Sequence, residues 1–411
     1  MSFKQRFSDL AGRLNGDDSG VWAVSDKASE LQMAGKDVIK LCVGDPDFDT
    51  PAPIHDAVAS SLKAGRTHYS PSQGELELRS AIADLETRTS RHPCSPEDVV
   101  IFPGATNALY TILSCLMNTG DELIVPEPMY VGYVGFLAAV GVKVKHVPLN
   151  SERNFALEID AIKACINSKT KAVLVNTPGN PAGNMMTREE MAELALFCYE
   201  RNVWLICDEV YSMITYNRRH VSMRSAATSL DNIIMVDGLS KSHAMSGWRI
   251  GWAVAPPALV PHLVNFAGAT VFGCTQFVQD AAAWALRHDE YYMSLMREEY
   301  QRRRDFLVER FNQMEGLSCQ SPDAGMFVMV KVCPLFTSGK EFAEGLVDTQ
   351  FVSVVPGEGF GPSAKEFVRV TLAQPVEILA DACDRIETYI KSVKPSLEEC
   401  VVDDSQKLKK A

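Results

Sequence analysis

The sequence predicts an α/β protein in which a large domain, with a mainly parallel sheet covered by helices, precedes a smaller α+β C-terminal domain. The first observation is that, from about residue 99, short runs rich in β-branched residues alternate with helical stretches. Strands that alternate with helices form βαβ units, whose crossovers bury both faces of a parallel sheet. The second is that this alternation stops after residue 288, where a long charged helix leads into more widely spaced strands. The change of pattern marks a second unit.

The strands of the large domain are predicted where apolar residues form short continuous runs, because a strand buried on both faces has no polar side. The runs are Val99–Phe102, Leu123–Val125, Val142–Val144, Ala172–Val175, Trp204–Cys207 and Ile233–Val236. After the first run, a helix is indicated by apolar residues at helical spacing: Leu109, Ile112, Leu113 and Leu116. Ligands of such sheets gather at the carboxyl ends of the strands, so residues directly after a run are candidates for a site.

In the second half, a charged helix is predicted from Asp289 to about Asn312. Three strands and a final helix follow, at Met326–Val332, Val352–Val355, Val368–Leu372 and Ile378–Val393. We therefore expect an N-terminal arm (1–45) that packs on the small domain, a large domain (46–288), a small domain (289–395) and a polar tail (396–411) that is frayed. The long helix connects the two domains.

The composition is that of an ordinary globular protein and excludes some partners. Of the 411 residues, 46% are hydrophobic and 22% charged, and the formal net charge is −12. Binding to a nucleic-acid backbone needs a basic face, so we expect no nucleic-acid partner. No apolar run approaches the roughly 18 residues of a membrane span, and charges interrupt the N-terminus where a signal peptide is apolar. We expect no membrane partner and a cytoplasmic protein whose 11 scattered cysteines are reduced.

The most informative segment is Gly238–Gly251, which places Lys241 on a tight turn after an apolar run and Arg249 shortly behind it. This arrangement suits a lysine that holds an aldehyde as a Schiff base, next to an arginine that holds a phosphate. Ser240 could add a hydroxyl to the phosphate. Pyridoxal 5'-phosphate (PLP) carries both groups on one ring, and its enzymes tether it through such a lysine.

A phosphate also requires amide donors, and the turn Pro103–Asn107 joins a strand to a helix. There the backbone N–H groups of Ala105 and Thr106, with the Thr106 hydroxyl, would face an anion at a helix N-terminus. The alternative is an ordinary tight turn at Gly104.

The pyridine ring needs an acid for its nitrogen and donors for its hydroxyl oxygen. Asp208 and Tyr211 come just past an apolar strand, where the carboxyl-end rule places a ligand. An aspartate paired with the ring nitrogen keeps it protonated, so that the ring accepts electrons. Tyr211 and Asn180 are suited to the hydroxyl oxygen. The alternative for Asp208 and the neighbouring Glu209 is that they cap the N-terminus of a helix.

The segment Asn176–Asn184 is dense in turn-forming residues directly after a strand. Most such segments are plain loops. An Asn-Pro bond can be cis, and we hypothesise that the Asn180–Pro181 bond is cis and aims Asn180 into a site.

Arg369 lies inside an apolar strand between two valines. A buried arginine costs free energy unless it faces water or a partner. One interpretation is an exposed sheet edge. The other is a bidentate grip on the α-carboxylate of a substrate.

With these residues assembled, the chain from Leu41 to Val393 resembles the class I aminotransferases of the fold-type I PLP superfamily. Gly44, in Val43–Phe48, is similar to the family's loop near the substrate carboxylate. Tyr69 resembles the tyrosine that reaches the cofactor phosphate of the partner subunit, and Tyr130 the ring that stacks on PLP. Six further residues match family motifs: Asn180, Asp208, Tyr211, Lys241, Arg249 and Arg369.

Two positions depart from the family pattern. Gly238 stands where many members carry serine, so one phosphate hydroxyl is expected to be missing. Ala182 replaces the commoner threonine after the Asn-Pro pair, which removes a hydroxyl but keeps Asn180.

The resemblance implies transamination of an L-amino acid and a 2-oxo acid by a PLP-binding homodimer. In it, Lys241 tethers the cofactor and carries the proton from the substrate, Asp208 stabilises the charge on the ring, and Arg369 orients the carboxylate. The alternatives are a cysteine-conjugate β-lyase on the same scaffold, and a regulatory protein that binds PLP or an amino acid without catalysis. Retention of the base and the electron-sink residues disfavours the regulatory protein.

The substrate is indicated by what the chain lacks. Between Ile250 and Leu286 there is no Lys or Arg for a second carboxylate. Strict aspartate specificity is disfavoured, unless Lys27 or Arg13 supplies a cation. Four stretches resemble the arginine–pyruvate transaminase subgroup: Val43–Ile54, Glu127–Val131, Ser242–Met245 and Gly325–Val330. Arginine or another non-dicarboxylic donor is expected, with pyruvate or 2-oxoglutarate as acceptor, and an aspartate or aromatic aminotransferase is the alternative.

Overall fold

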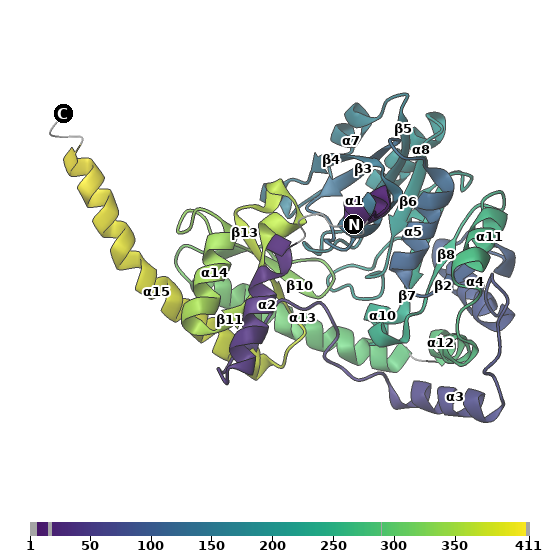
Figure 1. Ribbon diagram of the computed structural model, residues 1–411, viewed down its shortest axis with the longest axis horizontal. Coiled ribbons are helices and arrows are strands. Elements are labelled where there is room, and N and C mark those ends of the chain that lie inside the picture. The colour runs from purple at the N-terminus through teal and green to yellow at the C-terminus, as the bar shows by residue number, and fades with distance from the viewer. Residues whose placement is uncertain (1–5, 15–18, 289, 408–411) are drawn as a thin grey trace, which may run out of the picture. The chain divides into compact units, whose positions relative to one another are not determined.

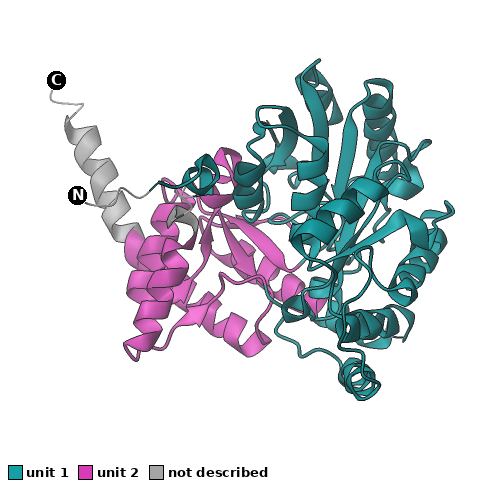
Figure 2. Ribbon diagram, turned by 45° about the vertical axis from the view of Figure 1, so that its right-hand side comes forward, with its two compact units in different colours: residues 1–16, 45–299, 322–325 teal, residues 17–44, 300–321, 326–411 magenta. Residues whose placement is uncertain are grey.

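The computed structural model describes residues 6–14, 19–288 and 290–407. The chain forms two compact units, which Figure 2 distinguishes by colour. Unit 1 comprises residues 1–16, 45–299 and 322–325, and unit 2 comprises residues 17–44, 300–321 and 326–411.

The described part of unit 1 is built on a seven-stranded sheet with the order β2-β8-β7-β6-β5-β3-β4 (Figure 1). Its strands are β2 (Val99–Phe102), β3 (Glu122–Glu127), β4 (Lys143–Pro148), β5 (Thr170–Asn176), β6 (Trp204–Asp208), β7 (Ile233–Gly238) and β8 (Gly251–Val254). β8 is antiparallel to both of its neighbours, and the other neighbouring pairs are parallel. The mainly parallel sheet is confirmed, and β8 is an addition that no predicted run covers.

Helices cover both faces of this sheet (Figure 1). They are α3 (Ala52–Lys63), α4 (Leu76–Ser90), α5 (Ala105–Leu116), α6 (Tyr133–Val140), α7 (Ile159–Cys165), α8 (Arg188–Glu200), α9 (Met223–Ala226), α10 (Leu239–Ser242), α11 (Val260–Thr270) and α12 (Gln276–His288). Successive strand residues point to opposite faces, so Phe102 packs in a core with α5, α6 and α11, whereas Ile101 packs in a core with α3, α4 and α12.

The N-terminal arm divides between the units, whereas the sequence analysis placed all of residues 1–45 on the small domain. Its first helix, α1 (Asp9–Leu14), belongs to unit 1. There the Arg13 guanidinium donates to the carbonyl oxygens of Ala138 (2.9 Å) and Ala139 (3.1 Å). These carbonyls lie in the last turn of α6, where a cation is favourable, and this explains the position of α1.

Unit 2 contains a four-stranded antiparallel sheet with the order β12-β13-β10-β9, and a parallel pair of β1 and β11. The strands are β1 (Ile39–Lys40), β9 (Ser318–Cys319), β10 (Phe327–Lys331), β11 (Val352–Ser353), β12 (Val355–Pro356) and β13 (Phe367–Thr371). The predicted single strand Val352–Val355 is wrong, because β11 and β12 pair with different partners and the chain leaves the first sheet at Val354.

Besides α2 (Ser19–Met33), the described part of unit 2 contains two whole helices and most of a third, which begins in the sequence of unit 1. They are α13 (Glu290–Gln313), α14 (Gly339–Gln350) and α15 (Val376–Lys407). Asp289, the predicted start of the long helix, lies outside the described residues, as do residues 408–411 of the predicted tail. The final helix was predicted to end at Val393, but α15 continues to Lys407.

The described residues contain neither a membrane-spanning helix nor a cluster of metal-ligating side chains. None of the helices there is both long and apolar enough to cross a membrane. No group of three or more His, Cys, Asp or Glu side chains there is arranged to hold a metal ion.

Candidate active site

The carboxyl ends of three adjacent parallel strands bring the polar residues of unit 1 to one edge of the sheet. Asn176 at the end of β5 is in register with Asp208 at the end of β6, and Asp208 is in register with Val236 near the end of β7. Lys241 follows β7 on the short helix α10, with Ser240 just before it. The order of the strands therefore places the predicted lysine turn beside the predicted acid, as the carboxyl-end rule requires.

Asp208 is buried, and its carboxylate has two neutral donors. Oδ2 accepts a hydrogen bond from the Tyr133 hydroxyl at 2.6 Å, and Oδ1 accepts one from the Val210 amide at 3.3 Å. Burial raises the pKa of Asp208 to about 6, and the bonds from Tyr133 and Val210 partly offset this rise. The pKa of Tyr133 is raised well above its ordinary value by burial and by the charge of Asp208, so its hydroxyl stays a donor. Asp208 remains ionised at neutral pH in a place suited to a cationic ring nitrogen.

Asn180 is held in a hydrogen-bonded loop that leads away from β5. Its amide donates to Asn176 Oδ1 at 2.7 Å, and Asn176 Nδ2 donates to the Asp208 carbonyl at 3.0 Å. The side chain of Asn180 donates through Nδ2 to the Tyr211 hydroxyl at 3.4 Å. The Asn180–Pro181 bond is cis, as hypothesised. Asn180 and Tyr211 are thus brought together, with Asn176 linking their loop to the strand that carries Asp208.

A second cluster forms around Arg249, which has a left-handed backbone (φ 54°) after the lysine turn. Its NH1 donates to the Ser246 carbonyl at 2.7 Å, and its NH2 donates to the Pro103 carbonyl at 3.4 Å. A Cβ atom at Gly104 would lie 2.5 Å from Arg249 NH2, so the guanidinium lies directly against the turn that begins α5. Ala105 and Thr106 are the first residues of α5, whose first amides have no partner within the helix. A guanidinium beside a helix N-terminus is an arrangement that binds a phosphate.

Two glycines allow the lysine turn and α5 to lie this close together. Gly238 of β7 is in register with Gly251 of β8. A Cβ at Gly251 would lie 2.6 Å from the Ala105 amide nitrogen, and one at Gly238 would lie 2.9 Å from the Ile250 carbonyl oxygen. Gly238, where many family members carry serine, therefore has no room for a side chain unless the backbone of β8 shifts.

Tyr130, which lies between β3 and α6, forms an aromatic pair with Tyr133, the first residue of α6. Their rings meet edge to face, with centroids 5.5 Å apart and an interplanar angle of 82°. A Cβ at Gly132 would lie 2.5 Å from the Tyr130 ring, so this glycine leaves space for the ring. Tyr130, which was predicted to stack on the cofactor, is therefore linked through Tyr133 to Asp208.

Tyr133 is the site residue that the sequence analysis missed. It lies past the carboxyl end of β3, where the rule applied to Asp208 applies as well. A second tyrosine one helical turn after Tyr130 was the signal that could have found it.

Tyr69 is not buried among the residues of its own chain. Its side chain is 83% exposed, and its ring meets the ring of Phe272 edge to face, with centroids 4.9 Å apart. Phe272 is itself 59% exposed. The two rings form an outward-facing aromatic pair on unit 1.

In unit 2, Arg369 lies in β13 between β12 and β10. It is 3% exposed, so the exposed-edge interpretation is wrong. Its guanidinium lies over the rings of Phe327 (3.9 Å) and Phe360 (4.9 Å), and NH2 donates to the Cys42 carbonyl at 2.7 Å. Gly44 shares this place, since a Cβ there would lie 2.5 Å from the Phe327 ring. The two residues predicted to bind a carboxylate are thus together, with the guanidinium plane fixed by aromatic rings.

The fold is that of the fold-type I aminotransferases, and comparison with known proteins agrees. Residues 36–386 match the family model described as aminotransferase class I and II. The chain is 43% identical over 381 residues to the arginine–pyruvate transaminase of Pseudomonas aeruginosa, which covers 93% of this chain and 97% of the relative. It is 33% identical over 377 residues to the aspartate aminotransferase of Bacillus subtilis, which covers 90% and 95%. A solved alanine aminotransferase from Pyrococcus furiosus has a TM-score of 0.89 and 30% identity, and covers 94% of this chain and all of that one (100%).

The chain therefore belongs to the class I and II aminotransferases and is an enzyme of transamination. The resemblance stated from the motifs is confirmed, as is its likeness to the arginine–pyruvate transaminases. The family is generally PLP-dependent, and the relatives reported above are aminotransferases, so the β-lyase alternative gains no support.

Proposed function

We propose that this aminotransferase binds PLP in unit 1 and moves the α-amino group of a non-dicarboxylic L-amino acid, arginine first among them, to a 2-oxo acid such as pyruvate or 2-oxoglutarate. The observation that carries the proposal is the buried carboxylate of Asp208, which is held by Tyr133 at the sheet edge that also carries the lysine turn. Bound PLP supplies an electron sink for the carbanion of the substrate. The protein supplies the groups that hold it and move the proton.

The donor set fits both ends of PLP. Arg249 and the first amides of α5 would hold the phosphate, with Thr106 and Ser240 as hydroxyl donors. The close approach of Gly104 to the guanidinium supports this role, because a larger residue would fill the cradle. At the other end, Asp208 would pair with the ring nitrogen, Asn180 and Tyr211 would bond the ring hydroxyl oxygen, and Tyr130 would pack on the ring.

Lys241 carries the chemistry of the protein. Its amine would tether the cofactor until the amine of the substrate replaces it, and would then take the proton from the substrate Cα and deliver it to the cofactor carbon. Asp208, being ionised, would keep the ring nitrogen protonated through these steps. The position of Lys241 on α10, directly after β7, supports this assignment.

Arg369 and Gly44 would bind the α-carboxylate of the substrate in unit 2. A guanidinium that already stacks on Phe327 and Phe360 loses little freedom when it binds a carboxylate, which favours a bidentate grip. Fixing the carboxylate orients the Cα–H bond for proton removal.

A donor other than aspartate is supported by the contacts of Lys27 and Arg13, the two N-terminal cations that were the candidates for binding a second carboxylate. Lys27 forms an ion pair with Asp348, and Arg13 binds the carbonyls of Ala138 and Ala139. Each therefore has other partners. The 43% identity to a protein named as an arginine–pyruvate transaminase favours a basic donor and pyruvate, whereas the aspartate aminotransferase at 33% identity represents the second candidate.

We further propose a homodimer in which Tyr69 reaches the cofactor phosphate of the partner subunit. The exposed pair of Tyr69 and Phe272 supports it, because two large apolar rings facing outward from a loop are typical of an interface. A cytoplasmic location stays a prediction.

A kinetic panel tests the choice of substrate. The purified enzyme would be given arginine, lysine, alanine, phenylalanine and aspartate, each with pyruvate and with 2-oxoglutarate, and kcat/KM compared. We expect arginine with pyruvate to exceed aspartate with 2-oxoglutarate by at least about tenfold, which corresponds to roughly 1.4 kcal/mol of transition-state stabilisation. A preference for aspartate by orders of magnitude would overturn the proposed donor while leaving transamination intact.

A further inference from the structure

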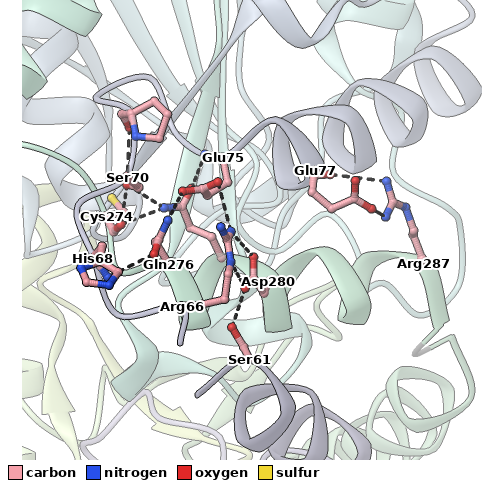
Figure 3. Close-up of polar contacts among 12 residues, drawn as sticks. Ser61, Arg66, His68, Ser70, Glu75, Glu77, Cys274, Gln276, Asp280 and Arg287 are labelled. Atoms are coloured by element: carbon pink, nitrogen blue, oxygen red, sulfur yellow. Dashed lines mark hydrogen bonds and ion pairs between the residues drawn. The ribbon is translucent and has the colours of Figure 1, made fainter. Parts of the chain in front are cut away.

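The loop that carries Tyr69 connects α3 to α4 and belongs to neither helix nor strand. An exposed tyrosine on a loop ordinarily moves freely, and a moving hydroxyl makes a poor ligand because its freedom is lost on binding. Here the residues on both sides of Tyr69 are held in place: the His68 backbone by a side chain of α12, and the Ser70 side chain by the turn before that helix (Figure 3).

Both sequence neighbours of Tyr69 form hydrogen bonds with α12 or with the turn that precedes it. The His68 amide donates to Gln276 Oε1 at 3.2 Å, and the Ser70 hydroxyl donates to the Cys274 carbonyl at 2.7 Å (Figure 3). Gly273 allows this approach, since its φ is +132° and a Cβ there would lie 2.6 Å from the Ser70 carbonyl oxygen. The same turn holds Phe272 at a φ of 66°, where its ring meets that of Tyr69.

Gln279 joins the two halves of the loop. Its Nε2 donates to the Ser70 hydroxyl (3.2 Å) and to the Cys274 carbonyl (2.8 Å), while its Oε1 accepts from the Glu75 amide (2.7 Å). The side chain is fully buried, at 0% exposure. A buried amide with three bonds holds its partners firmly, because each lost bond would leave a desolvated polar group.

A charged group fixes the start of the loop. Arg66 makes a bidentate pair with Asp280, through Nε and NH2 at 2.8 Å each, and its NH2 lies 3.1 Å from Glu75 Oε2 (Figure 3). Gln276 Nε2 donates to Glu75 Oε1 at 2.9 Å. Residues at the start of α12 and just before it thus hold the loop at Arg66, His68, Ser70 and Glu75, while the Tyr69 ring stays exposed.

We propose that Gln279, supported by Asp280, is a positioning residue that holds the Tyr69 hydroxyl ready for the cofactor phosphate of a second copy of the chain. The inference rests on the proposed PLP binding and dimer. According to this inference, α12 contributes to the affinity for the cofactor in addition to its packing in the core.

A double-mutant cycle tests this proposal through the dissociation constant for PLP, measured by titrating the apoenzyme of the full chain. The variants are Tyr69→Phe, Gln279→Met and the double substitution. We expect Tyr69→Phe to weaken binding about tenfold or more, as the loss of a charge-assisted bond does, and Gln279→Met to weaken it by about fivefold. In the double variant, Gln279→Met should add less than about twofold, because its effect passes through the missing hydroxyl.

Glu77→Gln is the matched control. Glu77 pairs with Arg287 across the same α4–α12 contact but at the far end of α12 (Figure 3). It should change the thermal stability without changing the PLP dissociation constant.

The outcomes separate this inference from the function on which it rests. Equal losses from Gln279→Met with and without the Tyr69 hydroxyl would show a merely structural role and overturn the inference. If Tyr69→Phe itself leaves PLP binding unchanged, the proposed role of Tyr69 in the dimer fails instead. Should Gln279→Met not fold, Asp280→Asn takes its place in the cycle, because Asp280 is partly exposed and its substitution is milder. Additive losses from Asp280→Asn and Tyr69→Phe would likewise overturn the inference.

Discussion

Asp208 and Tyr133 show how one hydrogen bond sets the charge of a buried site residue. Burial alone favours the neutral carboxyl, whereas the Tyr133 hydroxyl and the Val210 amide stabilise the carboxylate, and the resulting pKa is about 6. The carboxylate is therefore ionised at neutral pH and able to pair with a cationic ring.

Replacing Tyr133 with Phe tests this balance. Loss of the donor should raise the pKa of Asp208 above about 6, because a bond to the charged form lowers the pKa. The rate that depends on the carboxylate is lost as the pH falls through this pKa. We therefore expect the acid limb of the kcat/KM profile to move to higher pH, and kcat at pH 7 to fall by about tenfold.

Tyr110→Phe is the control, since its ring packs on Phe266 and Tyr110 is not among the groups that shift the pKa of Asp208. An acid limb that stays in place in Tyr133→Phe would show that the bond does not set the charge of Asp208.

The positions of residues just after the strands could be predicted from chain order, whereas the bond between Tyr133 and Asp208 could not, because it depends on how the strands lie side by side. Lys241, Asp208 and Asn180 each come shortly after a strand, so chain order and the carboxyl-end rule were enough. Tyr133 follows β3, and β5 lies between β3 and the strand of Asp208. The sequence does not show that its segment reaches across.

The contact between α5 and the segment after β7 shows what fixes the site at the scale of elements. Gly104 has a φ of +93°, and its missing Cβ leaves space for Arg249. The helix terminus and the guanidinium can therefore converge on one anion.

We expect Gly104→Ala to weaken PLP binding by about tenfold, because the methyl group would displace the guanidinium. Gly120→Ala is a matched control: its φ is +91°, but nothing lies within 4 Å of the added Cβ. Both variants should lose at least about 1 kcal/mol of unfolding free energy, because an L-residue with a side chain is disfavoured at positive φ. Equal PLP affinity in the two variants, measured by titration of the apoenzymes, would rule out the cradle.

Elements with a continuous β-branched run were predicted well, and elements without one were not. The six predicted strands of the large sheet all exist, with ends that differ by a few residues. β8 was missed because Gly-Trp-Ala-Val is short and begins with glycine. β11 and β12 were merged because Val352, Val354 and Val355 form a short run of valines, and the change of partner at Val354 depends on β1 and β13.

At the scale of the whole molecule, the stability of the fold depends on buried ionisable groups that have no role in the proposed reaction. Glu86 and Arg224 are buried with Nε and Oε2 3.5 Å apart, and Glu209 is bonded to His220 at 2.9 Å. Burial, and to a smaller extent the charge of Glu209, raise the pKa of Glu86, whereas Arg224 lowers it, and the resulting pKa is about 8. Glu86 is therefore largely protonated in the folded protein at neutral pH.

This protonation predicts a stability that falls with rising pH. A raised folded-state pKa means that the stabilising contribution is complete below the unfolded value near 4.5 and is lost as the pH rises through about 8. The unfolding free energy of the wild type should fall with rising pH more steeply than that of Glu86→Gln, by at most about 1.4 kcal/mol per pH unit. Urea unfolding of both proteins from pH 5 to 8 measures the two slopes. Exposed Glu200→Gln should leave the slope unchanged, and a slope kept by Glu86→Gln would show that another group is responsible.

The attachment of PLP to Lys241 is the claim from which the other roles follow, and reductive trapping tests it most directly. The protein would be saturated with PLP, treated with borohydride to fix any lysine-bound cofactor, digested and mapped by mass spectrometry, with Lys241→Ala treated in parallel. We expect the pyridoxyl group on the peptide that contains Lys241, and neither the group nor turnover in Lys241→Ala. A pyridoxyl group on another lysine, or turnover that survives in Lys241→Ala, would contradict the assignment.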